Sequence, residues 1–209
     1  MRMERSRYVT AEGIKVRLSS LVYSRKTAIV NMGDAHNCPS DIAGYCDISH
    51  ECYGKNPERI WKGVVKYRRK QGRCWREATP DQLVALTFYL HKKYEVERLR
   101  FNEVSDFWSQ LDVDKLNVMA DNGPLKIFGY TANKYLDYKN ASFCLKLSHF
   151  GELIEGTTGN TVVIPKHTDP PKGYILCPKT VKKMRCDDGG CGICFSKNKT
   201  VNVAFWKHG

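Results

Sequence analysis

The chain contains 209 residues, with 34 Lys and Arg against 22 Asp and Glu, so its formal net charge is +12. Hydrophobic residues make up 42% of the chain and charged residues 27%, a composition that can bury a core and excludes a disordered tail or a collagen-like repeat. No apolar run approaches the roughly 20 residues that span a bilayer, and the basic N-terminus leads into no apolar stretch of the kind found in secretory signals. We therefore expect a cytoplasmic protein, in the host cell if it is viral, with no membrane partner.

The first expected elements are two strands followed by a long loop. Residues 14–18 alternate between apolar and polar side chains, and residues 27–30 form a short apolar run. The loop after this run is rich in Gly, Asp, Asn and Pro, and it carries three cysteines within residues 38–52.

Two helices are expected next. The first should begin with Asn56 as its cap and Pro57 at its first position. Its apolar residues recur with helical spacing at Ile60, Trp61, Val64 and Val65. The second should begin with a capping box, in which Thr79 precedes Pro80 and Gln82 follows three residues after the cap.

The second half of the chain is expected to be rich in strands, with one helix over residues 113–120. The expected strands cover residues 99–101, 125–128, 143–147, 161–164, 174–176 and 201–205. Alternation of strand, helix and strand implies parallel pairing, so we predict an α/β fold, either an incomplete barrel or an open, mostly parallel sheet. Residues 1–165 should form this core, and residues 166–209 a Cys-rich segment packed on it.

Nine cysteines in a reducing compartment indicate metal or cluster ligands rather than disulfides. Four of them have the spacing C-x8-C-x4-C-x2-C: Cys177, Cys186, Cys191 and Cys194. Four thiolates can complete a tetrahedral zinc site or bind the four irons of a [4Fe–4S] cluster. Because only one pair is tightly spaced, the pattern favours iron–sulfur, with zinc as the alternative.

A second set, Cys38, Cys46 and Cys52, has the spacing C-x7-C-x5-C. Three thiolates leave one iron of a [4Fe–4S] cluster open to a substrate or cofactor. Alternatively, His36 or His50 completes a closed structural site, or the three cysteines join those of the C-terminal set around one shared site.

Glu103 and Asp106 follow the strand expected over residues 99–101. Charged residues at a strand end of an α/β protein often carry out chemistry, so both are candidate catalytic residues. The alternative is that they cap the next helix or face water.

Positive charge is concentrated in two segments. Residues 57–78 contain eight basic and two acidic side chains, and residues 166–199 contain eight basic and three acidic ones. Such segments attract phosphates, so we expect nucleic acid as a partner, with Arg68, Arg69, Lys70 and Arg73 as contacts. The alternative for the first segment is a solvated helix face.

These motifs occur in the order typical of one family. They are Cys38-Pro39, Cys46, Cys52-Tyr53, the run Arg100 to Phe107, Gly129-Tyr130-Thr131, Cys177-Pro178, Cys191-x2-Cys194 and His208-Gly209. Over most of its length the chain resembles the gene-product-88 family of phages, plasmids and archaeal mobile elements. The chain has Ser105 before Asp106, where the family commonly has Gly. The resemblance implies a cysteine-bound cluster and an origin in a mobile element.

The chain is also remotely similar to radical S-adenosylmethionine enzymes. In that family a three-cysteine loop follows the first strand of a partial α/β barrel, and an acidic motif after the second strand contacts the methionyl amine. Cys38, Cys46 and Cys52, followed by Glu103 and Asp106, have the same order. The spacing differs from the usual C-x3-C-x2-C of that family.

Three hypotheses follow. The first is an iron–sulfur protein of a mobile element, with one or two [4Fe–4S] clusters and a radical-type or other cluster-dependent activity on nucleic acid or a nucleotide, with S-adenosylmethionine as a cofactor. The second is a non-catalytic nucleic-acid-binding protein stabilised by zinc or an iron–sulfur site. The third is a structural or interaction protein in which metal serves folding alone.

Overall fold

The computed structural model describes residues 7–11, 13–18, 26–148, 151–182, 191–197 and 200–207. Nine strands form two sheets in this part of the chain. The larger sheet contains β1 (Arg7–Ala11), β2 (Ile14–Leu18), β3 (Thr27–Val30), β4 (Arg98–Phe101), β5 (Lys126–Thr131) and β6 (Cys144–Leu147). The smaller contains β7 (Thr161–Ile164), β8 (Tyr174–Leu176) and β9 (Asn202–Trp206).

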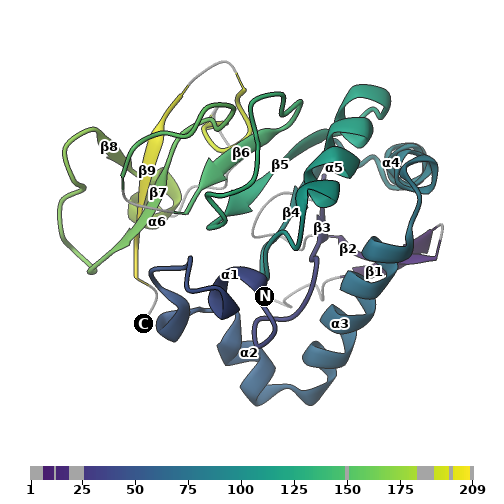
Figure 1. Cartoon of the computed structure of the whole chain (residues 1–209), viewed down its shortest axis with the longest axis horizontal. Helices are drawn as coiled ribbons and strands as arrows, with labels where there is room; N and C mark the ends of the chain where they lie inside the picture. The colour runs from purple at the N-terminus through teal and green to yellow at the C-terminus, as the bar shows by residue number, and fades with distance from the viewer. Residues whose placement is uncertain are drawn as a thin grey trace.

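The strands of the larger sheet lie in chain order from β1 to β6 (Figure 1). β1, β2 and β3 pair antiparallel, whereas β3, β4, β5 and β6 pair parallel. A parallel bridge from Leu147 to Asn160 continues the run into the smaller sheet, whose strands are parallel in the order β7, β9, β8. The prediction of an α/β fold with mostly parallel strands is confirmed.

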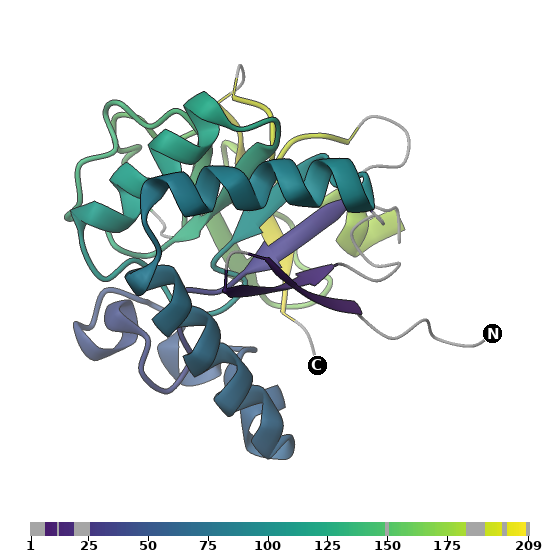
Figure 2. The same cartoon turned by 90° about the vertical axis from the view of Figure 1, so that its right-hand side faces the viewer.

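Helices cover one face of the larger sheet, as Figure 2 shows. They are α3 (Lys62–Glu77), α4 (Pro80–Tyr94) and α5 (Gln110–Asn122). Shorter helices are α1 (Pro39–Ile42), the 3-10 helix η1 (Ser49–Glu51), α2 (Lys55–Ile60) and α6 (Pro178–Lys182). The capping box expected at the second helix is present, since Thr79 accepts from the Gln82 amide and Gln82 accepts from the Thr79 amide.

The hydrophobic core lies between the sheet and these helices. Val16, Val30 and Phe101 come from successive strands and are each at most 1% exposed. Trp75 of α3 is fully buried in the same core, and its indole N–H donates to Asp112 of α5 at 2.7 Å. Because side chains of a strand alternate between faces, the neighbours of these strand residues lie on the other face of the sheet.

That other face is partly covered by the C-terminal segment 191–197. The ring of Phe195 packs against Phe128 with centroids 4.9 Å apart, and the guanidinium of Arg98 lies 4.9 Å from the Phe195 ring. Lys146 on the same face is completely buried, and its ammonium donates to the carbonyls of Thr158 and Val201, each at 2.8 Å. These bonds join β6 to the residues that lead into the smaller sheet, and burial lowers the pKa of Lys146.

One helix differs from its prediction. The chain forms two helices, α2 and α3, which are separated at Trp61, where the backbone is extended. Gly54, not Asn56, is the residue at the N-cap of α2. Ile60 and Trp61 were expected on the apolar side but are 63% and 64% exposed, because the break at Trp61 interrupts the helical spacing.

The boundary expected at residue 165 falls within the smaller sheet. β7 precedes this residue, whereas β8 and β9 follow it, and β9 pairs with both of the other strands.

Close packing of α3 against the chain after β3 requires a glycine. A Cβ atom on Gly72 would lie 2.4 Å from the carbonyl oxygen of Met32, which is backbone and cannot rotate away. Gly63 in the same helix has no atom within 4 Å of its Cβ position. Substitution of Gly72 by Ala therefore changes both the contact with Met32 and the helix propensity, whereas substitution of Gly63 changes the helix propensity alone.

We predict that Gly72→Ala lowers the free energy of unfolding by at least about 2 kcal/mol, because α3 must move away from Met32. Gly63→Ala is the matched control and should raise it by about 0.5–1 kcal/mol, since Ala is the better helix former. Urea denaturation followed by circular dichroism measures both changes. Equal effects of the two substitutions would contradict the packing argument.

Candidate functional site

The N-terminal cysteines lie in the loop that follows β3. Cys38 immediately precedes α1, and its carbonyl accepts the Ile42 amide at 3.0 Å. The Cys46 amide donates to the Ser40 carbonyl at 3.2 Å, which folds the middle of the loop back onto its beginning. Cys52 follows η1, and its carbonyl accepts the Lys55 amide at 3.0 Å. Local hydrogen bonds thus hold all three cysteines in one compact loop.

The thiol of Cys46 interacts electrostatically with the thiols of both Cys38 and Cys52. Burial, together with a smaller effect of the nearby Asp106 carboxylate, raises the pKa of Cys38 to about 12. Burial also raises the pKa of Cys46. Within the described ranges, no three His, Cys, Asp or Glu side chains form a group that could hold a metal ion. The three thiols therefore influence one another electrostatically, but they do not form such a group in the described structure.

Asp106 joins this loop to the sheet. Its carboxylate accepts from the Ser40 and Thr131 hydroxyls and from the Ala132 amide, each at 2.7 Å, and from the Phe107 amide at 2.8 Å. The residue is 3% exposed, and burial raises the pKa of this carboxyl against the effect of the four hydrogen bonds. All four donors belong to the protein, so Asp106 acts here as a positioning residue.

Sequence reasoning missed Ser40 and Thr131 as partners of Asp106. Both belong to motifs that it had identified, since Ser40 follows the Cys38-Pro39 pair and Thr131 ends the Gly-Tyr-Thr run. The local sequence around either hydroxyl does not show which acid it contacts, because they lie 66 and 25 residues from Asp106.

Two polar residues between Phe101 and Asp106 lack partners. Asn102 and Ser105 have φ angles of 48° and 70°, in the left-handed region that non-glycine residues rarely adopt. Asn102 is 5% exposed, and neither its amide oxygen nor its amide nitrogen has a hydrogen-bond partner in the described part of the chain. The Ser105 hydroxyl is likewise without a partner there. Buried polar groups of this kind require an explanation such as strain, a functional role or a bound water or ion.

Glu103, the second candidate acid, lies beside two arginines. Its carboxylate forms an ion pair with Arg17 of β2, and Arg100 lies 4.0 Å from the other carboxylate oxygen. The Glu103 side chain is 10% exposed, and its carbonyl accepts from the Tyr53 hydroxyl, which follows Cys52. Glu103 is therefore linked, like Asp106, to the cysteine loop.

The structure does not bring the C-terminal cysteines to this loop. The Cys144 thiol, at the first residue of β6, donates to the Cys194 carbonyl at 3.1 Å, so Cys194 lies at the amino end of the parallel strands. The Cys38 loop lies at their carboxyl ends, where Thr131 closes β5 (Figure 1). A site shared by Cys194 and the N-terminal set is therefore not formed.

The C-terminal set is itself spread out. Cys177 is buried at the carboxyl end of β8. The pairing of β6, β7, β9 and β8 places Cys177 six residues further along the strand direction than Cys144. At about 3.3 Å per residue, Cys177 lies about 20 Å further along the strands than Cys144 and Cys194, whose carbonyl Cys144 contacts. Cys191 is half-buried in the segment that contains Cys194, and Cys186 lies outside the described residues.

The predicted nucleic-acid contacts on α3 divide into two kinds. Arg68 is 6% exposed, and its guanidinium donates to Glu58 at 2.6 Å and to the Gly54 carbonyl at 2.9 Å. This buried ion pair contradicts the prediction that Arg68 contacts a phosphate. Arg69, Lys70 and Arg73 are exposed.

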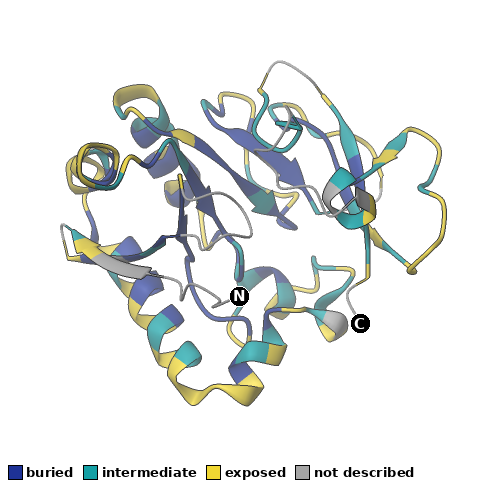
Figure 3. Cartoon of the chain, turned by 180° about the vertical axis from the view of Figure 1, so that it is seen from behind, coloured by how far each residue is buried: buried dark blue, intermediate teal, exposed yellow. Residues whose placement is uncertain are grey.

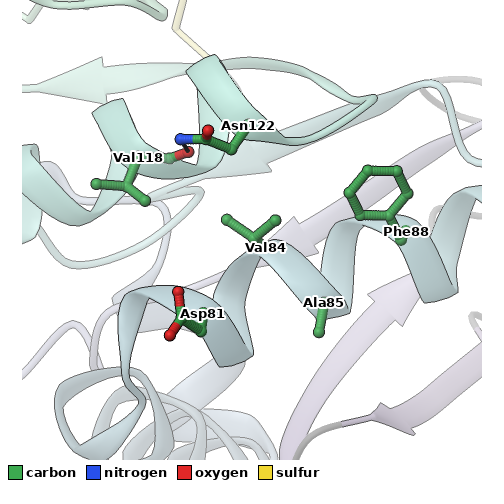
Figure 4. A pocket seen from close by; sticks show the side chains of 6 residues that line it. All are labelled: Asp81, Val84, Ala85, Phe88, Val118 and Asn122. Carbon is green, nitrogen blue, oxygen red and sulfur yellow. Dashed lines mark hydrogen bonds between the residues drawn. The ribbon is translucent and has the colours of Figure 1, made fainter.

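A shallow groove on the outer side of α4 and α5 is a further surface feature (Figure 4). Its lining residues are Asp81, Val84, Ala85, Phe88, Val118 and Asn122. They come from the helical layer and include one carboxylate, so the groove has no cluster of reactive groups.

No family model, curated protein or solved structure matches the chain. None of the helices in the described ranges has the length and apolar character needed to cross a membrane.

We predict that Asp106→Ala lowers the free energy of unfolding by at least about 3 kcal/mol, because it leaves two buried hydroxyls and two buried amides without an acceptor. Thr131→Val, which removes one donor from the same carboxylate, should cost about 1 kcal/mol. Urea denaturation of both variants measures the difference. A loss below about 1 kcal/mol for Asp106→Ala would show that the carboxylate does not hold the loop.

Proposed function

We propose that the protein is an iron–sulfur protein and that the thiolates of Cys38, Cys46 and Cys52 bind a [4Fe–4S] cluster. The observation that carries this proposal is the position of one compact three-cysteine loop after the first parallel strand of a sheet whose parallel strands, from β3 to β6, follow one another in chain order. In α/β proteins with such sheets, sites gather at the carboxyl ends of the strands.

The donor set fits this group. Each thiolate ligand of a [4Fe–4S] cluster binds a different iron, so the ligands stand further apart than those of a single zinc ion. The electrostatic interaction of the Cys46 thiol with those of Cys38 and Cys52 supports a site that uses all three. The raised pKa values of Cys38 and Cys46 mean that cluster binding has to displace their protons.

Three cysteines leave one iron available to a further ligand, and a reduced cluster can pass one electron to a ligand bound there. The similarity to radical S-adenosylmethionine enzymes makes that compound our candidate cofactor. We assign its contact to Glu103 and Asn102. Glu103 is joined to the loop through Tyr53, and both amide atoms of Asn102 lack partners in the described chain. Asp106 positions the loop, because four protein donors already occupy its carboxylate.

The setting follows from the same chemistry. Thiolate ligands persist in a reducing compartment, so we place the protein in the cytoplasm. The resemblance to the gene-product-88 family supports an origin in a phage or another mobile element. Cys191 and Cys194, which lie in one segment, stay candidate ligands of a second cluster or a zinc ion, whereas Cys177 at the end of β8 lies too far from Cys194 to share it.

The test is anaerobic purification of the full chain, followed by quantification of iron and sulfide and by EPR and Mössbauer spectroscopy. We expect a brown protein that absorbs near 400 nm, with about four irons and four sulfides for the N-terminal cluster. The combined variant Cys38→Ser, Cys46→Ser, Cys52→Ser should lose this complement. Cys74→Ser is the matched control, because Cys74 lies on α3 outside both sets, and it should keep the complement.

The combined variant Cys191→Ser, Cys194→Ser reports separately on the C-terminal set. A colourless protein without iron and sulfide, or a triple variant that keeps the full complement, would overturn the proposal. Cleavage of S-adenosylmethionine after addition of dithionite tests the enzymatic part, and a protein that has the cluster but neither binds nor cleaves this compound would refute that part alone.

A further inference from the structure

The exposed side of α3 is strongly basic. Six of its residues recur every three or four positions and are exposed: Lys62, Lys66, Arg69, Lys70, Arg73 and Arg76. We call these six residues the basic stripe. At 1.5 Å per residue the stripe is about 21 Å long. Gly63 and Glu77 are the other exposed residues of the helix, so the stripe has no exposed apolar neighbour on α3 and one exposed acid at its end. Figure 3 shows the exposed side of this helix.

Buried contacts fix this helix in place. On its inner side Arg68 is paired with Glu58, and Gly72 lies against the backbone of Met32. Arg69 is held by Asp34 at 3.0 Å, with its side chain still 54% exposed. Because these contacts hold the helix, the backbone positions of the stripe are fixed before any partner binds. Binding then orders few further groups.

Exposed indole rings stand at both ends of the basic stripe. Trp61 precedes α3 and is 64% exposed. Trp108 is 44% exposed, and the guanidinium of Arg76, the last residue of the stripe, lies 5.6 Å from its ring centroid. Aromatic rings beside a row of cations are typical of surfaces that bind single-stranded nucleic acid, where bases stack on the rings and phosphates lie on the cations.

We infer that the basic stripe with Trp61 and Trp108 binds single-stranded nucleic acid. A duplex offers its phosphates but not its base faces, so the two indoles favour a single strand over a duplex. A membrane surface fits less well, since the cations between the two indoles have no exposed apolar residue beside them on α3. On its inner side, opposite to the stripe, α3 is bonded through Arg68 to Gly54, two residues after Cys52. The inference does not depend on the presence of a cluster.

The test is fluorescence anisotropy of a labelled 20-nucleotide oligothymidine with the full chain. The combined variant Lys66→Ser, Lys70→Ser, Arg73→Ser should bind at least tenfold more weakly at low salt. Loss of three phosphate contacts should reduce the slope of log affinity against log salt by about 2. Lys92→Ser, Lys126→Ser, Lys172→Ser is the matched control, since it removes the same charge from exposed positions outside α3 and should keep most of the affinity and the slope.

Trp61→Ala tests stacking and should weaken oligothymidine binding at least about fivefold with an unchanged salt slope, because it removes no charge. Circular dichroism of each variant checks that it is folded. Equal losses in the stripe variant and the matched control would overturn the inference by showing that binding follows net charge alone. Equal or tighter binding to a duplex of the same length would overturn it as well. So would binding to vesicles of phosphatidylserine and phosphatidylcholine without binding to the oligonucleotide.

Discussion

The buried carboxylate of Asp106 is the contact on which the arrangement of the candidate site depends. It connects three segments that are distant in sequence: the loop of Ser40, the turn after β4, and the end of β5 at Thr131 and Ala132. Without this acceptor the cysteine loop would retain its local turns and the contact of Tyr53 with Glu103, but Ser40 would lose its link to the end of β5. A charge in such a position is costly unless it is fully hydrogen-bonded, and here four donors surround it. The Asp106 carboxylate fixes the position of the cysteine loop, in addition to any contribution it makes to stability.

Around this carboxylate the molecule contains two kinds of polar residue. Arg68, Glu58 and Lys146 are buried and hydrogen-bonded to distant residues, and they join segments of the fold to one another. Asn102 is buried and Ser105 half-buried, both in left-handed conformations, and their side chains are unsatisfied within the described structure. The first kind explains how the parts are held together. The second occurs next to Glu103 and the cysteine loop, which is why we place the cofactor contact there.

Sequence reasoning predicted what depends on local pattern. The capping box of Thr79 and Gln82 is encoded within four residues, and the strands are short apolar runs bounded by turn residues, so the fold class was correct. It failed where a distant contact decides. Arg68 belongs to a run of basic residues that looks solvent-exposed, yet Glu58 is buried beneath it. The break at Trp61 leaves Ile60 exposed despite its helical spacing. The separation of Cys194 from Cys38 depends on strand register, which no spacing of cysteines reveals.

The antiparallel strands at the start of the chain have a consequence for access. β3 pairs with β4 on one edge and with β2 on the other. It therefore has no free edge with which to pair β8, the last strand of the parallel run. The run from β3 to β8 therefore cannot close into a barrel by pairing β3 with β8, and the described strands form an open sheet. A molecule that reaches the cysteine loop can approach from the flank, and a long polymer need not be threaded through an opening.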